Sequence, residues 1–78
     1  MIEVFKTNVS DAVHANRLLG LIHSSFNEYK ANFDLEDCDK ILRIECKTGY
    51  VNTPLVIQLL SDTGFHAEIL QETVMPNR

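Results

Sequence analysis

The chain of 78 residues is long enough for one domain with a modest hydrophobic core, and too short for a catalytic domain joined to a second domain. A hydrophobic fraction of 45% with 23% charged residues is typical of a folded globular domain and argues against disorder. The net charge of −4, with only seven scattered Lys and Arg residues, argues against a surface for nucleic acid or anionic lipid.

The chain begins with MIEVFK and has no basic segment followed by an apolar run, so no signal peptide is expected. Its longest apolar runs are too short to span a bilayer. We therefore expect a cytoplasmic protein without membrane insertion. In that compartment Cys38 and Cys46 are expected to be free thiols, because disulfides are uncommon there.

Residues 2–9 are rich in β-branched and aromatic side chains, which predicts a first strand. Ser10 is the expected N-cap of a helix that follows, and Asp11 would lie in the first helical turn, where the helix dipole favours an anion. The helix is expected to run to Phe26. Its buried stripe is marked by apolar residues three and four positions apart: Ala15, Leu18, Leu19, Ile22 and Phe26.

From Tyr29 the hydrophobic period changes to two, which predicts a strand over residues 29–36 with one polar face. A second alternating segment covers residues 42–47, and its Cys46 is expected to point inward. The polar residues 36–40 between the two segments predict the tip of a β-hairpin. On the exposed face of the hairpin we expect polar side chains, namely Lys30, Asn32, Asp34, Arg43, Glu45 and Lys47.

Thr53 and Pro54 predict the N-cap and the first residue of a second helix. Its buried stripe is expected at Val56, Leu59 and Leu60, and Gly64 is expected to end it in a left-handed conformation. A last strand is predicted over residues 66–72. We expect one domain over residues 1–73, followed by a flexible tail over residues 74–78.

The predicted order of strand, helix, strand, strand, helix, strand is that of the ferredoxin-like α+β fold, a four-stranded antiparallel sheet with two helices on one face. Tracing the direction of each element places three segments at one end of the molecule. These are the joint between the first strand and the first helix, the hairpin tip, and the turn at residues 64–66. Asp11, His14, the acidic residues 36–39 and His66 are expected to converge there.

Residues 55–70, LVIQLLSDTGFHAEIL, resemble the C-terminal half of the heavy-metal-associated domains found in copper chaperones and metal-transporting ATPases. In that family the first loop carries a Met-Thr-Cys-x-x-Cys motif that holds a soft ion such as Cu(I). In this chain Asp11 and His14 stand at the two cysteine positions, and Leu18 matches the family's apolar anchor. A carboxylate with an imidazole suits a harder or borderline divalent ion such as Zn(II).

The candidate metal ligands are therefore Asp11 and His14, three residues apart at a helix start, with Cys38 and His66 as further ligands. The alternative is an aspartate stabilised by the helix dipole beside a surface histidine. The DLEDCD run around Cys38 invites comparison with a calcium loop, but its sixth position is Asp39 where such a loop requires Gly. We interpret that run as a solvated hairpin end.

No nucleophile with a paired base and no Gly-rich phosphate loop is present, so an enzyme is not expected. The first hypothesis is a degenerate metal-handling domain. The second is a non-catalytic protein interaction module that kept the scaffold and lost the metal, either a monomer or a weak homodimer. A third, a small regulatory ligand-binding domain, has no residue to support it.

Overall fold

Strands and helices follow one another in the predicted order in the computed structural model, which describes residues 1–70. The predicted tail over residues 74–78 and the end of the predicted last strand lie outside the described residues. The elements are β1 (Ile2–Thr7), α1 (Ala12–Ser25), β2 (Tyr29–Asp34), β3 (Ile41–Cys46), α2 (Thr53–Asp62) and β4 (Ala67–Ile69).

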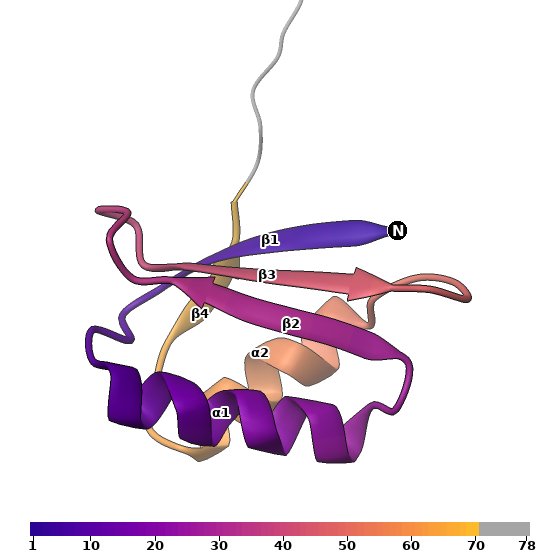
Figure 1. Cartoon of the computed structure of the whole chain (residues 1–78), viewed down its shortest axis with the longest axis horizontal. Coiled ribbons are helices and arrows are strands. Elements are labelled where there is room, and N and C mark those ends of the chain that lie inside the picture. Colours follow the sequence, from indigo (N-terminus) through magenta and orange to yellow (C-terminus); the bar gives the residue numbers. More distant parts are fainter. Residues whose placement is uncertain (71–78) are drawn as a thin grey trace, which may run out of the picture.

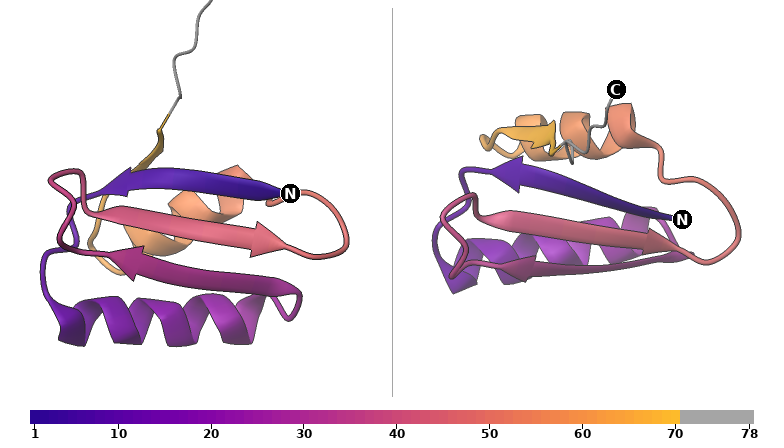
Figure 2. Two further views of the ribbon diagram at one scale, coloured as in Figure 1. Left: turned by 45° about the horizontal axis from the view of Figure 1, so that its top comes forward. Right: turned by 90° about the horizontal axis from the view of Figure 1, so that it is seen from above.

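The four strands form one antiparallel sheet in the order β2-β3-β1-β4. Both helices lie on one face of this sheet, with α1 along β2 and α2 along β4 (Figure 1). The opposite face is open, and Figure 2 shows it with the helices behind the strands. This arrangement is the predicted ferredoxin-like α+β fold.

The hydrophobic core lies between the sheet and the helices. Its fully buried side chains come from every layer: Phe5, Leu42 and Ile44 from the sheet, Leu18 and Ile22 from α1, and Val56 and Leu60 from α2. Burying a side chain of this size contributes about 1.5–3 kcal/mol. Cys46 is buried in the same cluster, as predicted, and Cys38 is exposed; both are free thiols.

Both predicted N-caps were wrong by one residue. Asp11, not Ser10, caps α1, and its carboxylate accepts a hydrogen bond from the amide of His14. Asn52, not Thr53, caps α2, and its side-chain oxygen accepts from the amide of Leu55. In each helix the cap is the residue whose side-chain oxygen reaches the free amide three positions on. Gly64 has a φ of +92°, the left-handed conformation predicted just after α2.

The first strand is shorter than predicted, and the last strand begins one residue later than predicted. β1 ends at Thr7 because the Thr7 side chain accepts a hydrogen bond from the amide of Val9, which turns the chain out of the sheet. Val9 is nevertheless fully buried in the joint that follows. β4 begins at Ala67, so His66 precedes the strand. Neither helix within residues 1–70 has the length and apolarity needed to cross a membrane.

Candidate functional site

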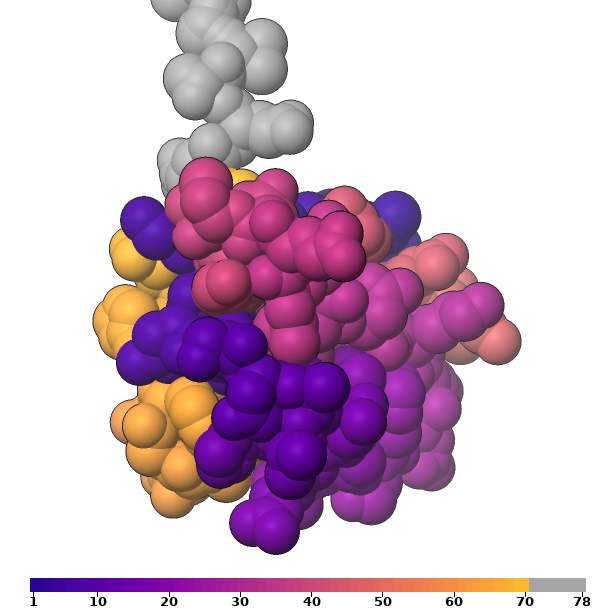
Figure 3. Space-filling view, turned by 60° about the vertical axis from the view of Figure 1, so that its left-hand side comes forward, coloured from indigo at the N-terminus to yellow at the C-terminus, as the bar shows by residue number. Residues whose placement is uncertain are grey.

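Three segments that are distant in sequence meet at one end of the molecule, as the topology predicts. The joint after β1, the hairpin tip and the turn before β4 form a continuous surface in Figure 3. The amide of Thr7 donates to the carbonyl of Asp39 in the tip at 3.1 Å, and the amide of Asn8 donates to the carbonyl of His66 at 3.3 Å. These hydrogen bonds hold the candidate site residues on a common frame.

Asp11 and His14 are in direct contact at the start of α1. One carboxylate oxygen of Asp11 accepts from the amide of His14 at 2.9 Å, and the other lies 2.6 Å from Nδ1 of the His14 ring. These bonds, above all the one from the His14 amide, lower the pKa of Asp11. The ring of His14 also packs against Phe65, with ring centroids 5.3 Å apart. The imidazole is thus oriented from two sides while half of its surface stays exposed.

The other two predicted ligands lie apart from this pair. The backbone of His66 is held by Asn8, and its ring Nε2 lies 3.7 Å from the carboxylate of Glu68. Within residues 1–70, neither Cys38 nor His66 completes a group of three potential ligand atoms with Asp11 and His14 at mutual distances up to 4.8 Å. The structure therefore brings together two of the four candidates.

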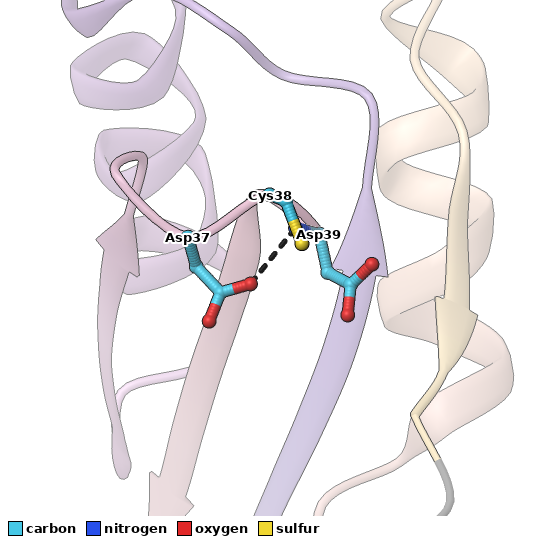
Figure 4. A group of neighbouring side chains, drawn as sticks. All are labelled: Asp37, Cys38 and Asp39. Atoms are coloured by element: carbon cyan, nitrogen blue, oxygen red, sulfur yellow. Dashed lines mark hydrogen bonds between the residues drawn. The ribbon is translucent and has the colours of Figure 1, made fainter.

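Cys38 lies instead between two aspartates at the hairpin tip (Figure 4). Potential ligand atoms of Asp37, Cys38 and Asp39 all lie within 4.8 Å of one another. Both carboxylates have partners within the fold: that of Asp37 accepts from the amide of Asp39 at 2.8 Å, and that of Asp39 lies 3.8 Å from the ammonium of Lys6. These contacts stabilise the turn at the hairpin tip, and they account for the closeness of the three side chains.

A shallow hollow of about 420 Å³ lies on the open face of the sheet. Its apolar lining comes from Ile2 and Val4 of β1, Ile41 of β3 and Leu70 after β4, and its polar lining from Glu3, Asp37 and Arg43. Ile41 is only 5% exposed and does not belong to the main core, whereas Ile2 is 56% exposed.

Sequence reasoning missed this hollow. The alternation of the hairpin correctly predicted exposed polar residues on the open face, among them Lys30, Asn32 and Arg43. The sequence of β1 could have predicted the apolar side chains of the hollow, because Ile2 and Val4 alternate with the inward-facing Phe5 and Thr7. Because the first strand is apolar on both faces, part of the open face had to be apolar as well.

Comparisons with protein-family models, with curated proteins and with solved structures found no match for this chain. The resemblance to heavy-metal-associated domains therefore stays a prediction. The assignment of the fold depends on the observed strand order and helix placement alone.

Proposed function

We propose that this protein is a non-catalytic interaction module whose open sheet face receives a partner protein. The observation that carries the proposal is the hollow with its four apolar side chains on a face that no helix covers. Surfaces that combine apolar side chains with charged groups in this way occur in non-obligate protein interfaces. Glu3, Asp37 and Arg43 at its margin offer charges of both signs to such a partner.

The shape of the hollow favours a protein over a small molecule. Small-molecule sites are concave enough to enclose most of the ligand surface. Here the floor is an open sheet, and Ile2 keeps more than half of its surface exposed. A partner that lays an apolar side chain over Ile2 and Val4 would bury the remaining apolar surface of this face.

The proposal can be tested by selecting peptides from a random library on the immobilised protein and measuring their affinities by fluorescence anisotropy. We expect enriched peptides with apolar residues. Their binding should weaken by about tenfold or more in the Ile2→Lys and Val4→Lys variants, because a charge would then replace one of the apolar side chains that line the hollow. Ile2 is the more informative position, since its exposure makes misfolding of that variant improbable.

The matched control is Val13→Lys, because Val13 is 72% exposed and lies on α1, on the helical side of the sheet. This variant should bind the selected peptides like the original chain. Enriched peptides that bind the Ile2→Lys and Val4→Lys variants as tightly as the original chain would contradict the proposal. A library from which no sequence is enriched would also contradict it.

Weak binding of a divalent metal ion at Asp11 and His14 is the second proposal, and one feature favours it. Metal-binding histidines commonly donate their second ring N–H to a carboxylate, which orients the ring. The contact between His14 Nδ1 and Asp11 has this geometry and leaves Nε2 of the half-exposed ring for an ion such as Zn(II). One imidazole supplies only one of the four ligands that a structural zinc site uses, so the affinity should be low.

Adding Zn(II) to the isotopically labelled protein while recording amide shifts tests the second proposal. Shifts should change at residues 11–15 and should be absent in the His14→Gln variant, whose fold is expected to be intact because the side chain is exposed. Cys38 and His66 should respond little, since they lie in other contacts. A titration that leaves residues 11–15 unchanged at excess Zn(II) would rule out metal handling through this pair.

A further inference from the structure

The strand β2 forms an outer edge of the sheet, because the described part of the chain pairs it with β3 alone. An edge strand presents a row of backbone amides and carbonyls to any strand that approaches it. In an antiparallel ladder these groups alternate in direction, so the amides of Tyr29, Ala31 and Phe33 point away from β3. The Tyr29 amide already donates to the carbonyl of Phe26 at 3.2 Å.

His23 of α1 covers the next amide of this edge. Its ring Nε2 accepts a hydrogen bond from the amide of Ala31 at 3.0 Å. An imidazole nitrogen can accept only with a free lone pair, so the ring must be neutral with its hydrogen on Nδ1. A protonated imidazole carries hydrogen on both nitrogens. Protonation of His23 therefore breaks this bond and uncovers the Ala31 amide.

Few charged groups surround this bond. The α1 and C-cap neighbours of His23 are uncharged: Leu19, Gly20, Phe26 and Asn27. On β2, Lys30 and Asp34 alternate with Ala31 and project from the open face, away from α1. The carboxylate of Glu28 accepts from the hydroxyl of Thr48, and no ion pair within residues 1–70 includes His23.

The exposed charges of β2 are symmetric about its Asn32. Lys30 lies two residues before Asn32 and Asp34 two residues after it, all on the open face. If two copies of β2 pair antiparallel about Asn32, each Lys30 faces an Asp34 of the other copy. Opposite charges at facing positions stabilise a strand pair.

Other registers lose this match. Centring the pair on Ala31 sets Asp34 opposite the partner's Glu28, and centring it on Phe33 sets Lys30 opposite the partner's Glu36, which lies in the turn beyond the end of β2. Registers in which one strand is shifted by an odd number of residues are excluded, because they would place inward-facing side chains opposite outward-facing ones. In the register about Asn32, the Ala31 amide that His23 covers would donate to the carbonyl of the partner's Phe33.

We propose that β2 is a self-association edge that pairs antiparallel with β2 of a second copy of this chain, and that neutral His23 closes this edge while protonated His23 opens it. The partner is a second copy of the chain because Lys30 and Asp34 of one β2 strand can face Asp34 and Lys30 of another. This goes beyond the proposed function, since it concerns a different surface and a different partner. If this proposal fails, the proposed function of the hollow on the open face is not affected.

Sedimentation velocity of the full chain at about pH 7.5 and about pH 5.5 tests the role of His23, because histidine is the side chain whose charge changes most readily between pH 5 and 8. We expect the dissociation constant of the dimer to fall about tenfold or more on acidification, because one backbone amide on each copy becomes free to donate to the partner strand. The His23→Ala variant should dimerise at both pH values, and His14→Gln and His66→Gln should behave like the original chain.

A charge-exchange experiment tests the register. Lys30→Glu leaves two acidic residues on each β2, and Asp34→Lys leaves two basic residues, so each variant alone should stay monomeric at acidic pH. A 1:1 mixture of the two variants should form a heterodimer, since every facing pair is then of opposite charge. Recovery in the mixture also shows that both variants are folded.

Four outcomes would overturn the proposal. The first is a His23→Ala variant that is monomeric at every pH, and the second is a dimer that survives Lys30→Glu. The third is a pH response that remains without His23 and disappears without His14 or His66. The last is a mixture of the two charge variants that stays monomeric.

Discussion

The hydroxyl of Thr7 donates a 2.6 Å hydrogen bond to the carbonyl oxygen of Lys40, and this bond ties the end of β1 to the hairpin tip. The same oxygen accepts from the amide of Val9 at 3.2 Å. Thr7 is the one buried polar residue within the described chain, and its hydroxyl acts both as a hydrogen-bond donor and as an acceptor. The Thr7 side chain therefore fixes the joint to the tip together with the hydrogen bond from the Thr7 amide to Asp39.

Replacing Thr7 with Val keeps its shape and removes the hydroxyl. We expect a loss of about 1–3 kcal/mol in the free energy of unfolding, because the amide of Val9 and the carbonyl of Lys40 lose a buried partner. Urea denaturation followed by circular dichroism measures the loss. Thr7→Ser is the control, since it keeps the hydroxyl and should be the more stable variant. A valine variant as stable as the serine variant would show that the bond contributes little.

The two candidate caps of α1 can be distinguished by substitution. Asp11→Ala should lower the melting temperature by a few degrees, because the amide of His14 loses its acceptor. Ser10→Ala should leave the melting temperature nearly unchanged, since Ser10 is exposed and lies outside the helix. Calorimetry of the two variants decides the question. A larger loss of melting temperature in Ser10→Ala than in Asp11→Ala would identify Ser10 as the cap.

The pKa of Asp11 should be lower in the folded protein than in the unfolded chain, because His14 donates to its carboxylate from backbone and ring. A lowered folded pKa adds stability above the unfolded value of about 3.9, and this is lost as pH falls through the folded value. Carbon-detected NMR titration follows this carboxylate directly. In His14→Ala the pKa should rise only part of the way, since the amide of residue 14 still donates. An Asp11 that titrates alike in the folded and urea-unfolded protein would refute this account.

Two leucines of α2 provide a matched test of the core. Leu60 is fully buried and Leu55 is half exposed, although both lie in the same helix. Leu60→Ala should cost about 2–5 kcal/mol of unfolding free energy, because it removes buried methyl groups and leaves a cavity. Leu55→Ala should cost less than about 1 kcal/mol. Equal losses in urea denaturation would mean that α2 does not face the sheet as described.

The order of the elements could be predicted because it depends on local patterns. The change of hydrophobic period at Tyr29 marks the passage from helix to strand, and Gly64 marks the end of α2. Cys46 and Leu18 are buried as expected, because the period of a strand or helix decides which side chains share a face. With only six elements, the preference for right-handed crossovers then left few topologies open.

The end points were less predictable, since several residues there compete for the same role. Ser10 and Asp11 both suit an N-cap, as do Asn52 and Thr53, and only the path of the preceding loop decides which oxygen reaches the free amide. The length of β1 depends on the Thr7 hydroxyl and its tertiary partner Lys40. Such contacts join residues too far apart in sequence for a periodic pattern to contain them.

By itself, then, the sequence determined the fold class and the inward face of each element, because hydrophobic periodicity and turn residues act locally. It also determined that Asp11 and His14 would meet, since three residues of helix separate them. Only the tertiary structure decided that Cys38 and His66 lie apart from that pair, that Ile41 and Leu70 complete a hollow with β1, and that His23 covers the amide of Ala31. Those relationships follow from strand register and loop paths, which form when distant segments pack together.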